Sequence, residues 1–214
     1  MRPPRPSLFS LPPTLAVLFI VNVAVELLLL AADHGVLGSP LWRADAYANG
    51  AFWGGLLDNW RPNFPGQPAV MFLSYAFLHA GWQHLLGNMV MLVLLGRAVV
   101  ARCGEGGFLA IYFFACIGGG VGFALLGSSP RPMVGASGAL FGLLGALLAW
   151  EALRFRAAGR VPWPVWRDIA GLAVLNLVFW IILDGMLAWE THLGGFLAGG
   201  AVALVGSGRC RTGN

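Results

Sequence analysis

Long apolar runs alternate along the chain with short polar connections. A helix needs about 20 apolar residues to cross the hydrocarbon core of a bilayer, and runs of about this length predict six spanning helices. The predicted spans are residues 13–32, 82–101, 107–127, 134–153, 169–188 and 191–208. The pattern therefore predicts an all-α polytopic membrane protein of one domain, with one long connection, residues 33–70, after the first helix.

The composition supports a membrane protein. Of all residues, 58% are hydrophobic and 10% are charged, whereas soluble domains average about 25% charged. The first run resembles a secretory signal peptide in its basic start, but it carries Asn22 and Glu26 four residues apart. Since a signal peptide has a shorter and purely apolar central region, we expect residues 13–32 to be retained as a helix whose polar pair faces other helices.

The thirteen basic residues are all arginines, and they are divided unevenly between the connections. Only three lie on one side of the predicted membrane: Arg43, Arg61 and Arg131. Cytoplasmic loops carry the excess of basic residues. We therefore expect both termini in the cytoplasm, as tails of residues 1–12 and 209–214 that flank a membrane domain of residues 13–208. This topology explains the net charge of +4, so no nucleic-acid partner is expected.

The connection of residues 33–70 carries three tryptophans, Trp42, Trp53 and Trp60. Indole rings favour the headgroup region of a bilayer. The connection is therefore expected to form short amphipathic segments that lie in the interface on the outer side.

The chain has three cysteines, an odd number. By the arginine topology, Cys103 and Cys210 lie on the cytoplasmic side, where disulfides are rare. We therefore expect no disulfide.

The first candidate for chemistry is Ser137, at the start of the fourth predicted span. It follows Gly135 and Ala136 and precedes Gly138, after a loop with two prolines. Backbone N–H groups in the first turn of a helix have no intrahelical acceptor and favour an anion. Oxyanion chemistry is possible at such a place. The alternative is that these small residues serve only close packing between helices.

Further polar groups share helix faces near the starts of other spans. His84 and Asn88 are four residues apart and lie on one face of the second span. His192, Gly195 and Gly199 define a face of the sixth span. The fourth span has a matching face of Ser137, Gly138, Phe141, Gly142 and Gly145. Glycine-lined faces approach closely in membranes, which would bring His192 to Ser137.

The arginine topology places the starts of the second, fourth and sixth spans on the outer side, so His84, Ser137 and His192 share one depth. A histidine near a serine can act as its general base. Since no third, orienting acid is evident, the residues favour a Ser-His dyad. A zinc site is not expected, because Gln83 precedes His84 where the zincin pattern requires glutamate.

The combination of Gly135-Ala136-Ser137-Gly138, His192 with Gly195 and Gly199, and His79, His84 and Asn88 resembles a bacterial rhomboid, an intramembrane serine protease. The resemblance covers about residues 72–199. It implies a six-helix rhomboid-like bundle in the bacterial inner membrane, with the active site toward the outer side. Its substrates would be transmembrane segments of other proteins, which enter sideways near the fifth span, and it would need no cofactor and no metal.

The resemblance also implies residue roles. Ser137 would be the nucleophile and His192 the base. His84 and Asn88 would stabilise the oxyanion together with the backbone amide of Ser137. Four residues would support the site: Gly135, Phe141, Gly195 and Gly199. The loop of residues 184–190 would form a flexible cap.

Three departures from the family pattern are visible. Val70-Met71 stand where many relatives have Trp-Arg, and Val100 stands where many have a glutamate between two glycines. Those family residues act in scaffold stability. Phe141 replaces a frequent tyrosine, so orientation of the base would rest on packing alone. A catalytically inactive rhomboid-like protein that binds or escorts membrane proteins is the alternative function, and a transporter or channel is a further class.

Overall fold

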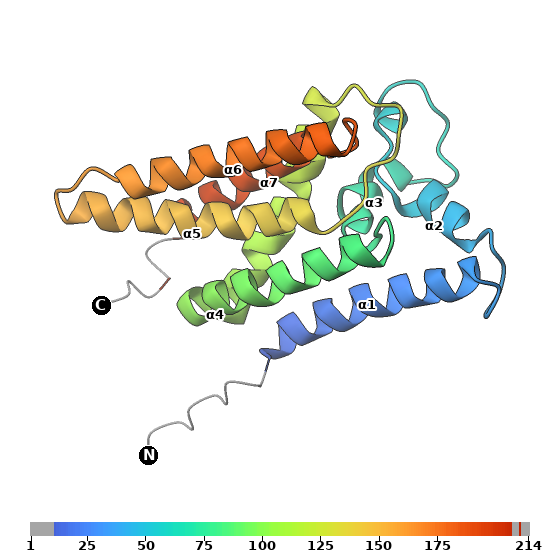
Figure 1. The fold of residues 1–214 in the computed structure, drawn as a ribbon, viewed down its shortest axis with the longest axis horizontal. Helices are drawn as coiled ribbons and strands as arrows, with labels where there is room; N and C mark the ends of the chain where they lie inside the picture. Colours follow the sequence, from blue (N-terminus) through green and yellow to red (C-terminus); the bar gives the residue numbers. More distant parts are fainter. Residues whose placement is uncertain (1–10, 207–209, 211–214) are drawn as a thin grey trace, which may run out of the picture.

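The structure, a computed structural model, describes residues 11–206 and Cys210. The predicted helical architecture is confirmed (Figure 1). In chain order the elements are α1 (Pro13–Asp33), α2 (Trp42–Gly50), η1 (Gly54–Leu57), α3 (Gln67–Ser74), η2 (Tyr75–Phe77), α4 (Trp82–Leu126), α5 (Ser137–Ala157), α6 (Trp163–Ile182) and α7 (Trp189–Val205). The predicted tails, residues 1–12 and 209–214, and the end of the predicted membrane domain lie largely outside the described residues.

Within the described residues, four helices are long and apolar enough to cross a membrane: α1, α4, α5 and α6. The 45-residue α4 is interrupted at Gly104, where φ is 70° and ψ is 177°. Glycine adopts positive φ at little cost, and the chain turns back at this point to run behind α5 (Figure 1). The parts on either side, residues 82–103 and 105–126, correspond to the second and third predicted spans. The 17 residues of α7 are at the lower limit for a spanning helix.

The predicted bounds of the fifth span, residues 169–188, were displaced toward the C-terminus. In the structure α6 begins at Trp163, with Pro164 in its first turn, and ends at Ile182. Proline is tolerated in the first helical turn because its missing N–H would have no intrahelical partner. The charged pair Arg167 and Asp168 therefore lies inside the helix, and Asp184 and Gly185 form a turn with positive φ.

The centre of the bundle is formed by α5, α7 and the second part of α4, which pack closely on one another. Glycine makes this approach possible. A Cβ atom at Gly195 would overlap the carbonyl of Gly138, and one at Gly199 would overlap the carbonyl of Gly142. The glycine faces of the fourth and sixth predicted spans are thus in direct backbone contact.

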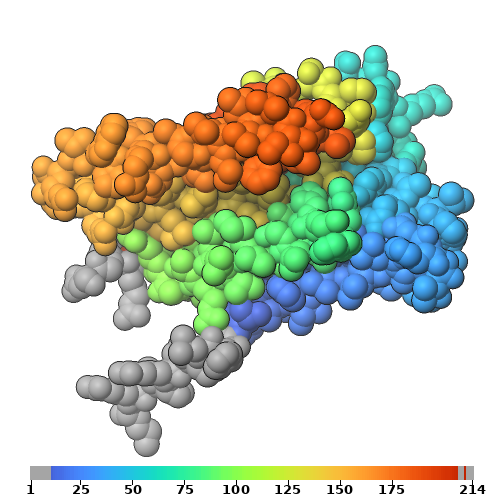
Figure 2. All heavy atoms as spheres, viewed as in Figure 1, coloured from blue at the N-terminus to red at the C-terminus, as the bar shows by residue number. Residues whose placement is uncertain are grey.

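By contrast, α6 lies on the outside of the bundle (Figure 2). Val165 is its only buried residue. Large apolar side chains along the rest of the helix are exposed, among them Val174, Leu177 and Ile181. In a membrane this surface would contact lipid or another transmembrane helix.

The connection after α1 is held by Arg43 of α2. Its guanidinium binds both carboxylate oxygens of Glu26, at 2.9 and 3.1 Å, and Asp33 at 2.7 Å. It also donates to the carbonyl of His79 at 3.0 Å. Glu26 is fully buried, and these charge-assisted bonds compensate its desolvation. Burial lowers the pKa of Arg43, but the hydrogen bonds to Glu26 and Asp33 outweigh this effect and raise the pKa above its usual range. The acidic residue of the first span therefore faces α2.

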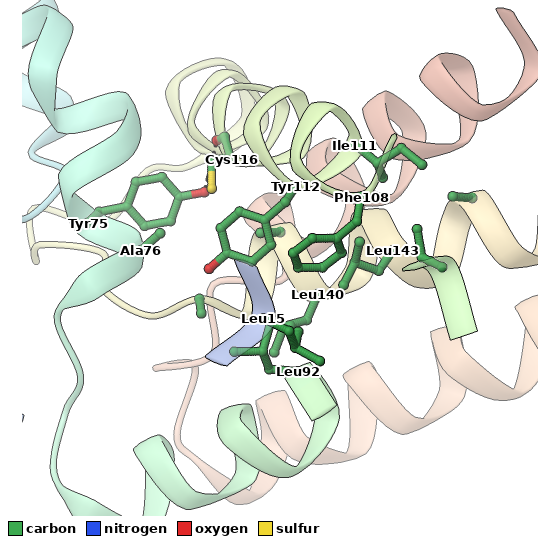
Figure 3. Packing of buried hydrophobic residues seen from close by; sticks show 14 of the residues in the cluster. Leu15, Tyr75, Ala76, Leu92, Phe108, Ile111, Tyr112, Cys116, Leu140 and Leu143 are labelled. Atoms are coloured by element: carbon green, nitrogen blue, oxygen red, sulfur yellow. Dashed lines mark hydrogen bonds between the residues drawn. The ribbon is translucent and has the colours of Figure 1, made fainter. Parts of the chain in front are cut away.

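The apolar core joins α1 to both parts of α4 and to α5 (Figure 3). Leu15 and Leu92 meet Phe108 and Tyr112 there, and all four are buried. At the edge of this cluster the hydroxyl of Tyr75 donates to the carbonyl of Cys116 at 2.9 Å. Tyr75 thereby fixes η2 against the second part of α4.

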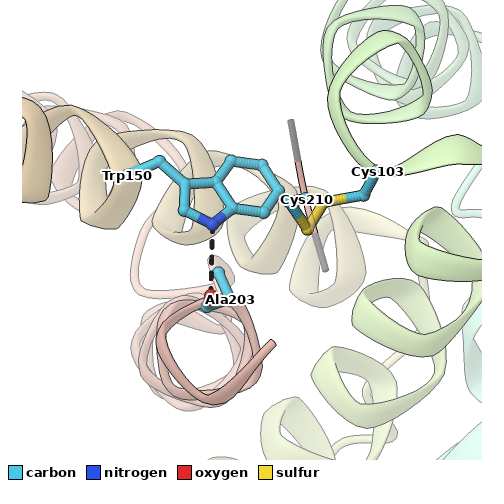
Figure 4. Close-up of a disulfide and its surroundings, with 4 residues drawn as sticks. All are labelled: Cys103, Trp150, Ala203 and Cys210. Atoms are coloured by element: carbon cyan, nitrogen blue, oxygen red, sulfur yellow. Dashed lines mark hydrogen bonds between the residues drawn. A yellow bond between two sulfur atoms is a disulfide. The ribbon is translucent and has the colours of Figure 1, made fainter. Parts of the chain in front are cut away.

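The prediction that no disulfide forms was wrong, since Cys103 and Cys210 are bonded (Figure 4). Their Cα atoms are 4.5 Å apart, although 107 residues separate them in sequence. Cys103 immediately precedes the break at Gly104, and Cys210 follows the end of α7. Near this disulfide, Trp150 Nε1 donates to the carbonyl of Ala203 at 3.1 Å, which links α5 to α7.

Candidate active site

The loop before α5 is fastened at two points. Phe52 and Met133 form reciprocal backbone hydrogen bonds of 2.9 Å, and the N–H of Gly135 donates to the carbonyl of Tyr75 at 2.9 Å. Gly135 has a φ of 120°, which side chains with a Cβ rarely allow. This geometry brings the chain into α5 with Ser137 as the first helical residue.

Ser137 and His192 are in direct contact. The Nε2 atom of His192 lies 2.9 Å from Ser137 Oγ. His192 belongs to the first turn of α7 and is only 8% exposed. The close approach of Gly195 to Gly138 sets the spacing of the two helices directly beneath this pair. The structure thus brings together the serine and histidine that the helix faces predicted.

The other ring nitrogen of His192 has a partner that the sequence analysis missed. Its Nδ1 atom lies 2.6 Å from Oδ1 of Asn176, on α6. The prediction that orientation of the imidazole would rest on packing alone was therefore wrong. A signal was present, since Asn176 is the only amide in an otherwise apolar run from Ile169 to Leu183, and polar groups inside membrane helices usually have a partner.

The predicted packing of Phe141 on the imidazole is also present. The two rings are stacked, with centroids 4.1 Å apart and an interplanar angle of 8°. Phe141 lies one helical turn after Ser137, on the same face of α5. The imidazole of His192 is therefore restrained by a ring face and by contacts at both nitrogens.

His84 and Asn88 face the residues that precede Ser137. A Cβ atom placed on Gly135 would lie 2.6 Å from His84 Cε1, 2.8 Å from its Nε2 and 3.4 Å from Asn88 Nδ2. Only glycine leaves this space open. Gly135 thus both permits the turn into α5 and admits two polar side chains from α4.

The tautomer of His84 follows from its other contact. The N–H of Ala80 donates to His84 Nδ1 at 3.3 Å, so Nδ1 is the acceptor and the proton is on Nε2. That N–H is directed at the space beside Gly135. Asn88 adds a second donor, because its Nδ2 is buried and has no hydrogen-bond partner in the part of the chain that the structure describes.

A buried amide without an acceptor is costly. Together, Asn88 Nδ2 and His84 Nε2 supply N–H groups to a site that adjoins a serine hydroxyl. The first-turn N–H of Ser137 itself has no intrahelical acceptor. An oxygen atom that gains negative charge during a reaction would meet preorganised donors here.

His79, in the loop before α4, is fully buried. Its ring packs edge-on against His84, with centroids 5.2 Å apart. Burial, with a smaller contribution from His84, lowers the pKa of His79 to about 3. His79 is therefore neutral at physiological pH and supports the position of His84.

The two departures that concern the scaffold, Val70-Met71 and Val100, fall on apolar or exposed positions. Val70 is 49% exposed on α3, and Met71 is fully buried in the core. Val100 packs at the edge of the same core. None of these residues contacts the Ser137 and His192 pair by hydrogen bonding, since all three side chains are apolar.

Comparison with known proteins gives consistent matches. Residues 66–209, more than half of the chain, match the Rhomboid domain. The chain is 34% identical over 134 residues to RHOMBOID-like protein 5 of Arabidopsis thaliana, an alignment that covers 59% of this chain and 40% of that protein. It is 36% identical over 127 residues to Rhomboid protease GluP of Bacillus subtilis, with coverage of 59% and 24%.

A third relative extends the similarity. RHOMBOID-like protein 6, mitochondrial, of Arabidopsis thaliana is 31% identical over 157 residues, which cover 71% of this chain and 48% of that protein. The chain therefore spans less than half the length of these relatives.

Proposed function

The chain belongs to the rhomboid family of membrane proteins, and on that basis we propose that it is an intramembrane serine endopeptidase that cleaves transmembrane segments of other membrane proteins. The observation that carries this proposal is the 2.9 Å contact between Ser137 Oγ and His192 Nε2. The second support is Asn88 Nδ2, which is buried and has no hydrogen-bond partner among the described residues.

In the proposed first step, Ser137 Oγ attacks the scissile carbonyl carbon while His192 Nε2 takes the hydroxyl proton. The carbonyl oxygen becomes negatively charged. His84 Nε2, Asn88 Nδ2 and the backbone N–H of Ser137 donate hydrogen bonds to it. The C–N bond then breaks, and His192 returns the proton to the leaving amine.

The second half of the proposed reaction releases the acyl group from Ser137. Ser137 now holds an ester to the N-terminal part of the substrate. A water molecule attacks this ester as His192 Nε2 removes its proton, and the serine oxygen leaves with that proton. The products are a free carboxyl group and the restored Ser137 hydroxyl. No cofactor or metal takes part in these steps.

The membrane environment determines how a substrate reaches Ser137. A helical transmembrane segment engages its carbonyls in its own hydrogen bonds, so it must unwind before a nucleophile can reach one. We place entry near α6, which has one buried residue and a largely exposed surface. The cap would be the loop of residues 184–190, of which the last two residues begin α7.

The topology belongs to the same proposal. If the two parts of α4 and the short α7 each cross the membrane, there are six spans and both termini lie on one side. The arginine distribution assigns that side to the cytoplasm, with Ser137 toward the outer face of a bacterial inner membrane. The segment from α2 to η1 would then lie in the outer interface.

The test is cleavage of a model transmembrane substrate in liposomes by the parent protein and by two single variants, Ser137→Ala and His192→Ala. Both variants are expected to fold, and each should cleave at less than about a hundredth of the parent rate. The reason is that the serine and the histidine act jointly, so loss of either one removes most of the activity. A parent protein that cuts no transmembrane substrate would instead favour the alternative, a rhomboid-like protein that binds membrane proteins without cutting them.

A further inference from the structure

Asn176 is the polar side chain in the apolar run of α6, residues 169–182, and the proposed mechanism does not use it. Its two functional atoms have different partners. Nδ2 donates to the carbonyl of Leu172, one turn earlier in the same helix, at 2.9 Å. Oδ1 faces Nδ1 of His192 at 2.6 Å.

The contact with Leu172 fixes which way the amide points. If the amide were rotated, its oxygen would face the Leu172 carbonyl oxygen, and two acceptors would meet without a proton between them. Oδ1 is therefore the atom that faces His192. Because an amide oxygen can only accept, His192 Nδ1 carries the ring proton.

A neutral imidazole has one protonated nitrogen. With the proton on Nδ1, the Nε2 atom presents its lone pair to Ser137 Oγ at 2.9 Å. This is the tautomer that a general base requires. The opposite tautomer would direct an N–H at the serine and could not take its proton.

The position of Asn176 gives this contact a further consequence. Val165, the only buried residue of α6, lies in the first turn of that helix, whereas Asn176 lies in its second half. Over that half, the neighbouring residues Leu175 and Leu177 are 50% and 56% exposed. The Asn176–His192 hydrogen bond therefore joins a sparsely packed stretch of helix to the base.

We propose that Asn176 is the positioning residue of the active site, which holds His192 in its basic tautomer and makes that tautomer depend on the position of α6. The inference rests on the proposed function. A displacement of α6 large enough to admit a substrate helix would break the 2.6 Å contact, and return of the helix would restore it. His192 therefore has its orienting hydrogen bond only when α6 lies in the position seen in this structure.

The test compares Asn176→Leu with Asn176→Asp. Leucine has a similar size and removes both contacts. Aspartate keeps an acceptor for Nδ1 in either protonation state, because even the neutral acid can donate its O–H to Leu172 and present its carbonyl oxygen to His192.

Asn22→Leu is the matched control. Asn22 also donates to the carbonyl four residues earlier, that of Leu18, at 2.8 Å, and it is fully buried. It lies in α1, away from His192. The Asn22→Leu variant therefore shows how replacement of a helix-bonded asparagine by leucine changes stability and activity when His192 is not involved.

Two rates are measured on each purified variant: kcat for a transmembrane substrate, and the second-order rate of labelling by a small fluorophosphonate. The small probe needs no helix entry, so it reports the base directly. Loss of the orienting partner of a catalytic histidine costs up to about 10⁴ in kcat where that partner is a carboxylate. For a neutral amide we expect Asn176→Leu to lower both rates about ten- to a hundredfold with KM unchanged.

Asn176→Asp should remain within about fivefold of the parent, and Asn22→Leu within about twofold, with similar melting temperatures for all variants. The inference is overturned if Asn176→Leu keeps both rates within twofold of the parent, or if only its KM changes, or if aspartate is as poor as leucine. Failure of the proposed function is a separate result, because it would leave the parent itself without a fluorophosphonate adduct on Ser137.

Discussion

The phenyl ring of Phe141 lies parallel to the imidazole of His192, with ring centroids 4.1 Å apart. A ring in this position restricts rotation of the imidazole about its Cβ–Cγ bond but makes no hydrogen bond. Asn176 supplies the directional restraint through Nδ1. The base is therefore held by one apolar contact from α5 and one polar contact from α6.

The role of this ring can be tested by Phe141→Leu, which keeps the apolar volume but removes the flat surface. We expect kcat to fall about three- to tenfold, since loss of a favourable ring pair is worth about 0.5–1.5 kcal/mol. Phe141→Tyr is the matched control and should remain within about twofold of the parent. An equal loss in both variants would show that shape at this position, and not stacking, limits the rate.

His84 and Asn88 should act mainly in the transition state. Their hydrogen bonds strengthen as the carbonyl oxygen gains charge, so Asn88→Ala should lower kcat by up to about 10² while KM changes little. The loss is expected at the lower end of the range for one donor, because His84 Nε2 and the Ser137 amide remain.

The control for this prediction is thermal stability. Asn88 Nδ2 is buried and has no hydrogen-bond partner within residues 11–206, so its removal should not lower the melting temperature. Melting temperature, KM and kcat are therefore measured together on Asn88→Ala, His84→Ala and the double variant. An unchanged kcat with a lowered melting temperature would show that both residues act in helix packing and not in catalysis.

Close packing of α5 on α7 gives a stability prediction. A Cβ atom at Gly199 would overlap the backbone of Gly142, so Gly199→Ala must push the helices apart. Overpacking of this kind typically costs about 1–3 kcal/mol, and we expect a lower melting temperature together with lower activity.

Gly171→Ala is the matched control for that variant. A Cβ atom at Gly171, in α6, would meet no other atom within 4 Å. Alanine favours a helix over glycine by about 1 kcal/mol, so this variant should be as stable as the parent or more so. Equal stability of the two alanine variants would contradict tight packing at Gly199.

Lateral access predicts a difference between substrates. A cysteine pair that links the outer ends of the first part of α4 and of α6 should slow cleavage of a transmembrane substrate, because α6 could no longer move aside. Fluorophosphonate labelling should be unaffected by the same link. Unchanged cleavage after complete cross-linking would remove α6 from the entry route.

The sequence predicted the parts of this molecule that depend on local periodicity. Apolar run length located the helices, and spacing of three and four residues placed Ser137, His192 and the glycines on facing surfaces. The start of α6 at Trp163 was missed because the charged residues of its second turn, Arg167 and Asp168, look like loop residues in a hydropathy pattern.

Two features were beyond such reasoning. The Cys103–Cys210 disulfide joins residues 107 positions apart, and nothing in their spacing marks them as a pair. The sequence shows Asn176 as a polar group that needs a partner, but not which one. Its pairing with His192 depends on how far α6 is rotated about its axis, which an almost uniformly apolar helix does not encode. In both cases the missing information is the relative placement of helices.

The central claim is that Ser137 is a nucleophile activated by His192. The most direct measurement is mass spectrometry of the purified protein after treatment with a fluorophosphonate, with Ser137→Ala and His192→Ala treated in parallel. The account predicts one adduct, on the peptide that contains Ser137, which is absent from Ser137→Ala and at least about a hundredfold slower to form in His192→Ala. An unlabelled parent, or an adduct that persists in Ser137→Ala, would contradict it.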